Sequence, residues 1–114
     1  MPFIDIKTSA KLNEAKKKSL YSICGELITI FPGKSEAWLM VNVSDECSMA
    51  FKGDDTSECA IVEVKIFGRS TQDAYGMFTK SFTEAFSSLS GIPKDRIYVK
   101  YDECSLWGYD GDNF

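Results

Sequence analysis

Four short stretches of the chain have the apolar content of β-strands, and the spacing of their apolar residues differs. In the first, Ile4 and Ile6 alternate with other residues, which is the two-residue period of a sheet. The second is almost continuously apolar, and such a run favours a strand covered on both faces. The third predicts a central strand, and the last alternates again, which favours one partly wet face. In order, these stretches are residues 2–7, 38–43, 60–67 and 96–101.

Two longer stretches repeat apolar residues at the three- to four-residue spacing of an amphipathic helix. The first predicted helix begins at Ser9 or at Asn13, because both residue types favour helix starts, and it continues to about Ile30. The second follows Ser70, which we expect to form a capping box with Asp73. The apolar stripes are Leu12, Ala15, Leu20, Ile23, Leu27 and Ile30 in the first helix and Ala74, Phe78, Phe82, Ala85, Phe86 and Leu89 in the second.

The elements follow the order β-α-β, a short edge piece at residues 48–51, and again β-α-β. A crossover helix between two strands of one sheet implies that these strands are parallel. Two such units predict an α/β (α+β) fold, a four-stranded mixed sheet with two helices on one face. We interpret residues 1–114 as one domain, a pseudo-repeat of halves at about 1–50 and 58–110. Because apolar strands need cover, we expect a partner subunit on the bare face.

Composition and charge argue against several classes of function. The 114 residues carry a net charge of −4, which argues against nucleic-acid binding, because that requires a basic face. No apolar run approaches the ~20 residues of a membrane span, and no signal-peptide pattern opens the sequence. We therefore expect a cytoplasmic protein without membrane contact, and release without a leader stays open. With four cysteines, no Cys-x-x-Cys pair and no histidine, neither a Cys/His zinc site nor a His-based triad is expected.

A proline at the second position is the main candidate for chemistry. If Met1 is removed, Pro2 carries a free secondary amine. An α-amine titrates near pH ~8, and burial or a nearby cation lowers its pKa further. Such a group suits general base catalysis near neutral pH. Taken alone, this proline is more simply the start of a strand, since the first strand residue needs no N–H.

Four features together resemble the macrophage migration inhibitory factor family of the tautomerase superfamily. They are Pro2 after Met1, the Pro32-Gly33-Lys34 turn before a strand, the run Asp95-Arg96-Ile97-Tyr98-Val99, and the tail from Trp107 to Phe114. Length and element order match this family over the whole chain. The resemblance implies a homotrimer whose sheets line a central channel, with active sites between neighbouring subunits and no cofactor or metal.

The resemblance also implies an activity, the keto–enol tautomerisation of phenylpyruvate and related aromatic α-keto acids and of dopachrome derivatives. The enzyme would then be a phenylpyruvate tautomerase and L-dopachrome isomerase. Eukaryotic members of the family are secreted without a signal peptide and act as cytokines. A cell-surface receptor is therefore a second candidate partner, beside a small aromatic keto acid.

The resemblance implies a role for each residue that matches the family pattern. Pro2 matches the catalytic proline, and Lys34 matches a lysine that helps to bind the substrate carboxylate. Phe67 falls at a pocket position whose backbone is a candidate contact, and Tyr98 matches a tyrosine supplied across the subunit interface. Lys100 stands where mammalian members have asparagine, which adds a second cation. The apolar wall positions of the tail are Trp107, Tyr109 (where tryptophan is usual) and Phe114.

Other functions stay open at this point. A cytokine-like signalling or binding protein with vestigial activity is the main alternative, and it predicts that a Pro2→Gly variant keeps its cell activity. A structural assembly module without chemistry is a third hypothesis, and it predicts no turnover even with a free N-terminus. No thiol-oxidoreductase activity is expected, because the stretch after Cys59 lacks the second cysteine of the family's Cys-x-x-Cys motif.

Overall fold

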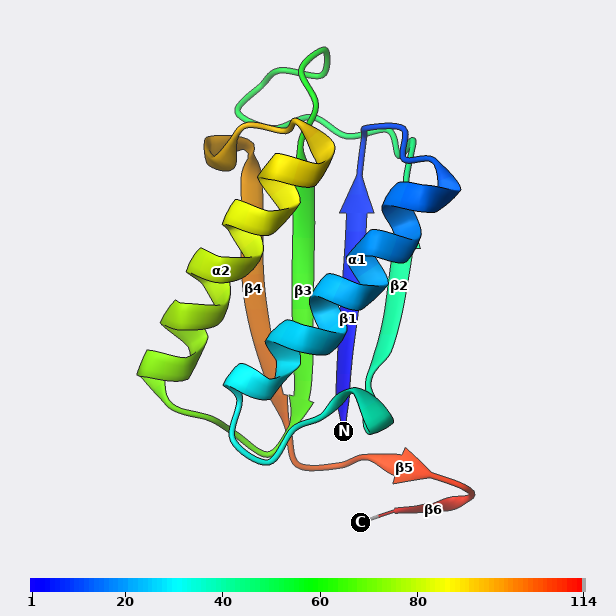
Figure 1. Cartoon of the computed structure of the whole chain (residues 1–114), viewed down its shortest axis with the longest axis vertical. Coiled ribbons are helices and arrows are strands. Elements are labelled where there is room, and N and C mark those ends of the chain that lie inside the picture. Colours follow the sequence, from blue (N-terminus) through cyan, green and yellow to red (C-terminus); the bar gives the residue numbers. More distant parts are fainter. Residues whose placement is uncertain (114) are drawn as a thin grey trace.

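Residues 1–113, which the computed structural model describes, form a four-stranded mixed sheet with two helices on one face (Figure 1). The strand order is β2-β1-β3-β4; β1 and β3 are antiparallel, whereas the two outer pairs are parallel. The predicted fold class is thus confirmed, with each crossover helix joining two parallel strands. The strands are β1 (Pro2–Thr8), β2 (Met40–Ser44), β3 (Ala60–Phe67) and β4 (Ile97–Cys104).

The remaining elements are two long helices, three short 3-10 turns and a small hairpin. The hairpin follows β4 and lies at the same end of the sheet as the N-terminus (Figure 1). Among residues 1–113, no helix is both long and apolar enough to cross a membrane. These elements are α1 (Glu14–Leu27), η1 (Ile28–Ile30), η2 (Glu36–Trp38), α2 (Gln72–Ser90), η3 (Lys94–Arg96), β5 (Gly108–Tyr109) and β6 (Asp112–Asn113).

The core lies between the sheet and the helices, and aromatic rings of α2 fill much of it. Phe78, Phe82 and Phe86 share one side of this helix and are fully buried, which confirms the predicted stripe. Their rings stack in sequence at centroid distances of 5.6 and 5.7 Å. The sheet supplies every second residue of its two central strands to the same core, namely Ile4, Ile6, Val62, Val64 and Ile66.

The helix starts differ in part from the predictions. Asn13, one of the two candidates, caps α1 by accepting a backbone hydrogen bond at 2.8 Å. The apolar stripe of α1 is rotated from the predicted one, because Ala15 is exposed and Cys24 is buried. The capping box at Ser70 is wrong; Thr71 is the cap, and its hydroxyl accepts a backbone hydrogen bond at 3.1 Å.

The prediction of a doubly covered strand at residues 38–43 is also wrong within this chain. Trp38 belongs to the turn η2, and β2 begins only at Met40, on the edge of the sheet. Met40 exposes 68% of its surface, so the apolar run does not report burial on both faces. Residues 48–51 form no strand, and Phe51 makes an isolated bridge instead.

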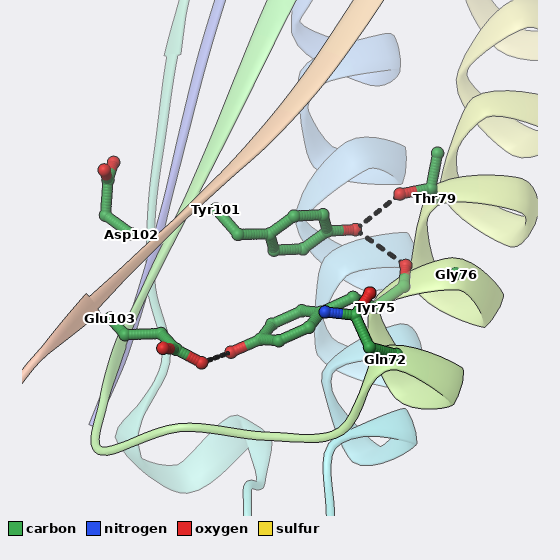
Figure 2. A pocket seen from close by; sticks show the side chains of 7 residues that line it. All are labelled: Gln72, Tyr75, Gly76, Thr79, Tyr101, Asp102 and Glu103. Atoms are coloured by element: carbon green, nitrogen blue, oxygen red, sulfur yellow. Dashed lines mark hydrogen bonds between the residues drawn. The ribbon is translucent and has the colours of Figure 1, made fainter.

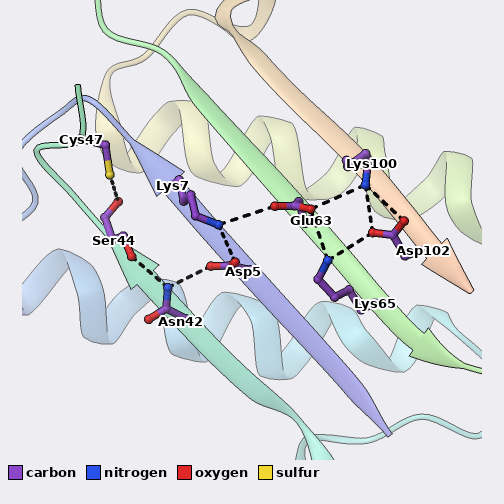
Figure 3. A network of polar contacts seen from close by, with 9 residues as sticks. All are labelled: Asp5, Lys7, Asn42, Ser44, Cys47, Glu63, Lys65, Lys100 and Asp102. Carbon is purple, nitrogen blue, oxygen red and sulfur yellow. Dashed lines mark hydrogen bonds and ion pairs between the residues drawn. The ribbon is translucent and has the colours of Figure 1, made fainter. Parts of the chain in front are cut away.

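Charged side chains occupy the open face of the sheet, opposite the helices (Figure 3). Glu63 stands near the centre of this network, 3.6 Å from Lys7 and 3.6 Å from Lys100. The middle of the bare face is therefore charged rather than apolar, because the alternate residues of the central strands face the helices. Met40 and Tyr98, on the outer strands of the same face, expose 68% and 60% of their surfaces. The network in the described part of the chain joins Asp5, Lys7, Glu63, Lys65, Lys100 and Asp102.

Replacing Phe82 by alanine should remove the middle ring of the stack and leave a cavity in the core. We expect a loss of about 3–5 kcal/mol in the free energy of unfolding, measured by urea denaturation at one fixed protein concentration. Met77→Ala is the control, because Met77 lies on the same helix with 58% of its surface exposed. Its free energy of unfolding should change by less than about 0.5 kcal/mol. Equal losses in the two variants would contradict this core.

Glu63 should make the stability of the protein depend on pH. A hydrogen bond from Lys65 lowers the pKa of Glu63 below its ordinary value. A carboxylate with a lowered folded-state pKa stabilises the fold above its unfolded pKa of ~4.3, and this contribution disappears as the pH falls through the folded pKa. Glu63→Gln should therefore have a lower urea midpoint than the parent at pH 7, and the two midpoints should converge below about pH 3.

Glu84→Gln serves as the control, because Glu84 is exposed and lies 4.0 Å from the ammonium of Lys94, which is likewise exposed. Its midpoint should follow that of the parent at every pH. A gap between Glu63→Gln and the parent that stays constant down to pH 3 would show that the charge of Glu63 contributes nothing.

Candidate active site

A cavity of about 410 Å³ opens at the N-terminal end of β1. The first residues of β1, the segment that leads into β2 and the start of the hairpin after β4 form its walls. Most of the side chains around it are apolar or aromatic, as is usual for sites that bind small organic molecules. The proline, aromatic and methionine side chains that line the cavity from β1, the η2–β2 segment and the hairpin include Pro2, Phe3, Trp38, Met40, Trp107 and Tyr109.

The sheet topology explains why distant segments meet at this cavity. Because β1 and β2 are parallel, both begin at the same end of the sheet, with Phe3 opposite Met40. The strand β3 runs antiparallel to β1, so it ends here, with Ile66 opposite Pro2. Since β4 is parallel to β3, it also terminates at this end of the sheet, and the hairpin that follows it lines the cavity.

The N-terminal residues are held by the end of β3. Pro2 is buried at the start of β1, and the carbonyl oxygen of Met1 accepts a hydrogen bond from the Phe67 amide at 3.0 Å. With Met1 present, the nitrogen of Pro2 is a peptide nitrogen, and the terminal amine belongs to Met1. Burial, followed by the charge and a hydrogen bond of Lys34, lowers the pKa of this amine below its ordinary value of about 8.

Lys34 is fixed beside the terminus by the turn that precedes η2. Gly33 takes a left-handed conformation with φ of 81°, which glycine adopts without strain, and Lys34 follows it directly. The Lys34 ammonium donates a hydrogen bond to the Phe67 carbonyl oxygen at 2.9 Å. The backbone of Phe67 thus contacts both Met1 and Lys34. The structure brings together three of the predicted site residues: Pro2, Lys34 and Phe67.

Aromatic side chains form one wall of the cavity. Trp107 and Tyr109 both line it, at the positions where the sequence predicts an apolar wall. Tyr109 meets Trp38 edge to face, with ring centroids 5.2 Å apart and an interplanar angle of 89°. Sequence reasoning missed Trp38 because it assigned this residue to a strand. The third predicted wall residue, Phe114, lies outside the described residues.

Tyr98 and Lys100 do not reach the cavity of their own chain. Tyr98 lies opposite Ile61 on β3, whereas Pro2 lies opposite Ile66. Five residues along a strand correspond to about 17 Å. Lys100 is tied to the open-face network by contacts of 3.0 Å with Asp102 and 3.6 Å with Glu63 (Figure 3). The expected role of Tyr98 at a neighbour's site thus requires a second subunit.

A larger hollow, of about 730 Å³, lies between α2 and β4 but contains none of the predicted site residues (Figure 2). Its hydroxyl groups bind one another and nearby acceptors: Tyr75 donates to Glu103, and Tyr101 contacts the Thr79 hydroxyl at 2.8 Å. Burial raises the pKa of Tyr101 to about 12, so this phenol stays protonated at neutral pH. We interpret the hollow as an open polar groove between α2 and β4, and we place the candidate site at the N-terminal cavity.

Comparison with known proteins agrees with the resemblance noted from the sequence. The sequence model of the macrophage migration inhibitory factor (MIF) family matches residues 1–112. The structure of Leishmania major MIF2 superposes with a TM-score of 0.92 at 31% identity, over 100% of this chain and 97% of that one. A comparison with curated protein sequences finds no significant match.

Two more distant structures share the fold. MIF from Toxoplasma gondii has a TM-score of 0.88 at 23% identity, over 98% of this chain and 99% of that one. A fused 4-OT protein described as a wild-type symmetric trimer has a TM-score of 0.85 at 13% identity, over 97% and 94%. On the family match over residues 1–112, the chain belongs to the macrophage migration inhibitory factor family.

Proposed function

We propose that the chain is a cofactor-independent keto–enol tautomerase of phenylpyruvate-like aromatic α-keto acids, with dopachrome-type compounds as further substrates. Pro2, freed by removal of Met1, is its general acid and base. The observation that carries the proposal is the position of Pro2, which is buried at the start of β1 at the edge of an aromatic cavity, directly after the Met1 amine whose pKa burial and Lys34 lower. Once Met1 is removed, the proline nitrogen becomes the terminal amine at this edge.

The reaction requires one base and a place for the ring and the carboxylate. The neutral Pro2 nitrogen takes a proton from the carbon between the ring and the ketone. The electrons of that C–H bond form the C=C bond, and the carbonyl electrons move to oxygen, which receives a proton from the Pro2 ammonium or from water. Keto acid and enol contain the same atoms, so no oxidant, reductant or cofactor takes part. General acid–base catalysis of this kind contributes about 10²–10⁴-fold.

Lys34 supplies the positive charge that the substrate carboxylate needs. Its ammonium lies 2.9 Å from the Phe67 carbonyl oxygen, so its position is fixed before a ligand arrives. The same charge disfavours protonation of the neighbouring amine, which keeps Pro2 available as a base. The backbone of Phe67, which contacts both Met1 and Lys34, is a further candidate contact for the carboxylate.

The aromatic wall would seat the ring of the substrate. Trp107, Tyr109 and Trp38 offer ring faces and edges around the cavity, and such contacts favour aromatic ligands over aliphatic ones.

A homotrimer would complete the site. Tyr98 projects from β4 with 60% of its surface exposed, and it is offset from Pro2 of its own chain by about 17 Å along the strand direction. An exposed tyrosine and the exposed Met40 favour contact with another subunit. The fused 4-OT structure of the same fold is described as a symmetric trimer. We therefore place Tyr98, with Lys100 two residues on, at the cavity of the neighbouring subunit.

Turnover of phenylpyruvate by the processed chain tests the proposal. Intact mass first establishes that Met1 is absent. A form that retains Met1 should lose at least about 100-fold in kcat/KM, because its proline nitrogen is an amide. Pro2→Gly, which removes the secondary amine and the rigid ring, should lose turnover as well. Pro93→Gly is the control, because this exposed proline precedes the turn at the other end of the sheet.

Turnover by the Met1-bearing form at the rate of the processed form would contradict a proline base. No turnover by the processed form would exclude the tautomerase function and favour a binding protein.

Lys34→Gln tests the second part of the site. Because the Lys34 charge lowers the pKa of the terminal amine, its removal should raise that pKa and move the acidic limb of kcat/KM to higher pH. Burial still lowers the pKa, so the shift should be partial. Loss of the carboxylate contact should raise KM by about 10–100-fold. Lys94→Gln, an exposed lysine beside Glu84, is the control. An acidic limb that stays in place would contradict the role of Lys34.

A further inference from the structure

The guanidinium of Arg96 organises the loop that precedes β3. Its nitrogens donate to the carbonyl oxygens of Glu58 at 2.9 Å, Phe51 at 3.2 Å, Ser57 at 3.1 Å and Asp54 at 3.3 Å. The Arg96 side chain is only 12% exposed, so water competes little for these donors. Residues 51–58 contain no strand that could pair their carbonyl groups, and Arg96 supplies donors to four of these carbonyls.

The loop is shaped to present these carbonyl groups to Arg96. The chain reverses at Lys52 and Gly53, both with positive φ, and the backbone of Phe51 and Asp54 makes a two-way bridge at 3.0 Å. One carboxylate oxygen of Asp54 then accepts hydrogen bonds from the Thr56 amide and hydroxyl, both at 2.8 Å. This turn holds the second half of the loop in register with the first.

Phe51 connects this clamp to Tyr98. The Phe51 ring lies 5.3 Å from the Arg96 guanidinium carbon, and its centroid is 4.7 Å from that of Tyr98. Arg96 is the last residue of η3 and Tyr98 is the second residue of β4, and the side chains of both contact the Phe51 ring. Although Tyr98 is 60% exposed, its ring has a fixed surface to lie against because Arg96 holds the Phe51 backbone.

We propose that Arg96 is a positioning residue, which fixes Tyr98 through the loop of residues 51–58 for the active-site cavity of the neighbouring subunit. The inference rests on the proposed function for the part that concerns substrate. A tyrosine already held in place loses little conformational freedom when a ligand binds, and this favours affinity. Proton transfer at Pro2 does not involve the clamp. Arg96 should thus affect KM and leave kcat and its pH profile unchanged.

Arg96→Lys is the test variant, because lysine keeps the charge but cannot donate to several carbonyl groups in one plane. KM for phenylpyruvate should rise about 2- to 10-fold, with kcat and the acidic limb of the pH profile unchanged. Phe51→Leu, which removes the ring and leaves the clamp, should raise KM by a similar factor. Lys52→Gln is the matched control: Lys52 also lies 5.3 Å from the Phe51 ring but donates to none of these carbonyls, so KM should stay the same.

A double-mutant cycle separates positioning from a general loss of structure. Combined with Tyr98→Ala, Arg96→Lys should raise KM no further than Tyr98→Ala alone, because both act through one ring. Independent, multiplicative effects would overturn the inference, as would an unchanged KM in Arg96→Lys. These results leave the proposed function intact as long as the parent turns over phenylpyruvate and Pro2→Gly does not.

The NMR signal of ¹³C-labelled Tyr98 tests, without any substrate, whether Arg96 fixes the position of the tyrosine ring. The ring should give one conformer in the parent and in Lys52→Gln, and averaged rotamers in Arg96→Lys. One unchanged conformer in Arg96→Lys would overturn the inference, whether or not the protein is an enzyme. Absence of turnover in the parent would overturn the proposed function and the effect on affinity together.

Discussion

The antiparallel register between β1 and β3 is the constraint on which the rest of this structure depends. It sets Pro2 opposite Ile66, so the start of the chain lies at the end of β3. The outer strands β2 and β4 pair in parallel with β1 and β3. The Lys34 turn, which precedes β2, and the aromatic hairpin, which follows β4, therefore lie at this same end of the sheet. The alternation that buries Ile4 and Ile6 among the phenylalanines of α2 holds this register, since a slip by one residue would place charged side chains in the core.

Charge is divided between two separate places in the fold. On the open face, lysines and carboxylates neutralise one another, and Lys100 is held there by Glu63 and Asp102. Beside the N-terminus, Lys34 contacts a neutral carbonyl group, and its charge acts on the terminal amine. The two lysines of the predicted site therefore have different surroundings within one chain. Lys34 lies beside the terminal amine, and Lys100 is part of the charged network on the open face.

The sequence predicts the fold well where period and burial agree. Ala60–Phe67 and the phenylalanines of α2 match their predictions, because a central strand and a buried helix face leave clear patterns. The prediction for Trp38 was wrong because an apolar run next to an edge strand does not indicate burial. The prediction of Ser70 as the helix cap was wrong because the adjacent Thr71 has a hydroxyl group that can cap equally well. For the site, the family pattern named Pro2, Lys34 and Phe67 but not the hydrogen bonds of the Phe67 backbone that join Lys34 to the N-terminus. The offset of Tyr98 along β4 is set by the strand register, and its expected role requires a second subunit. Neither can be read from the pattern of a single sequence.

The proposed mechanism requires that the fold makes the nitrogen of Pro2 a base at neutral pH. The most direct measurement is an NMR titration of the processed chain with ¹⁵N- and ¹³C-labelled proline, followed at the Pro2 resonances. Burial at the start of β1 and the charge of Lys34 predict a pKa clearly below the ~8 of an ordinary α-amine. A pKa at or above that value would leave Pro2 protonated at neutral pH and would contradict the account.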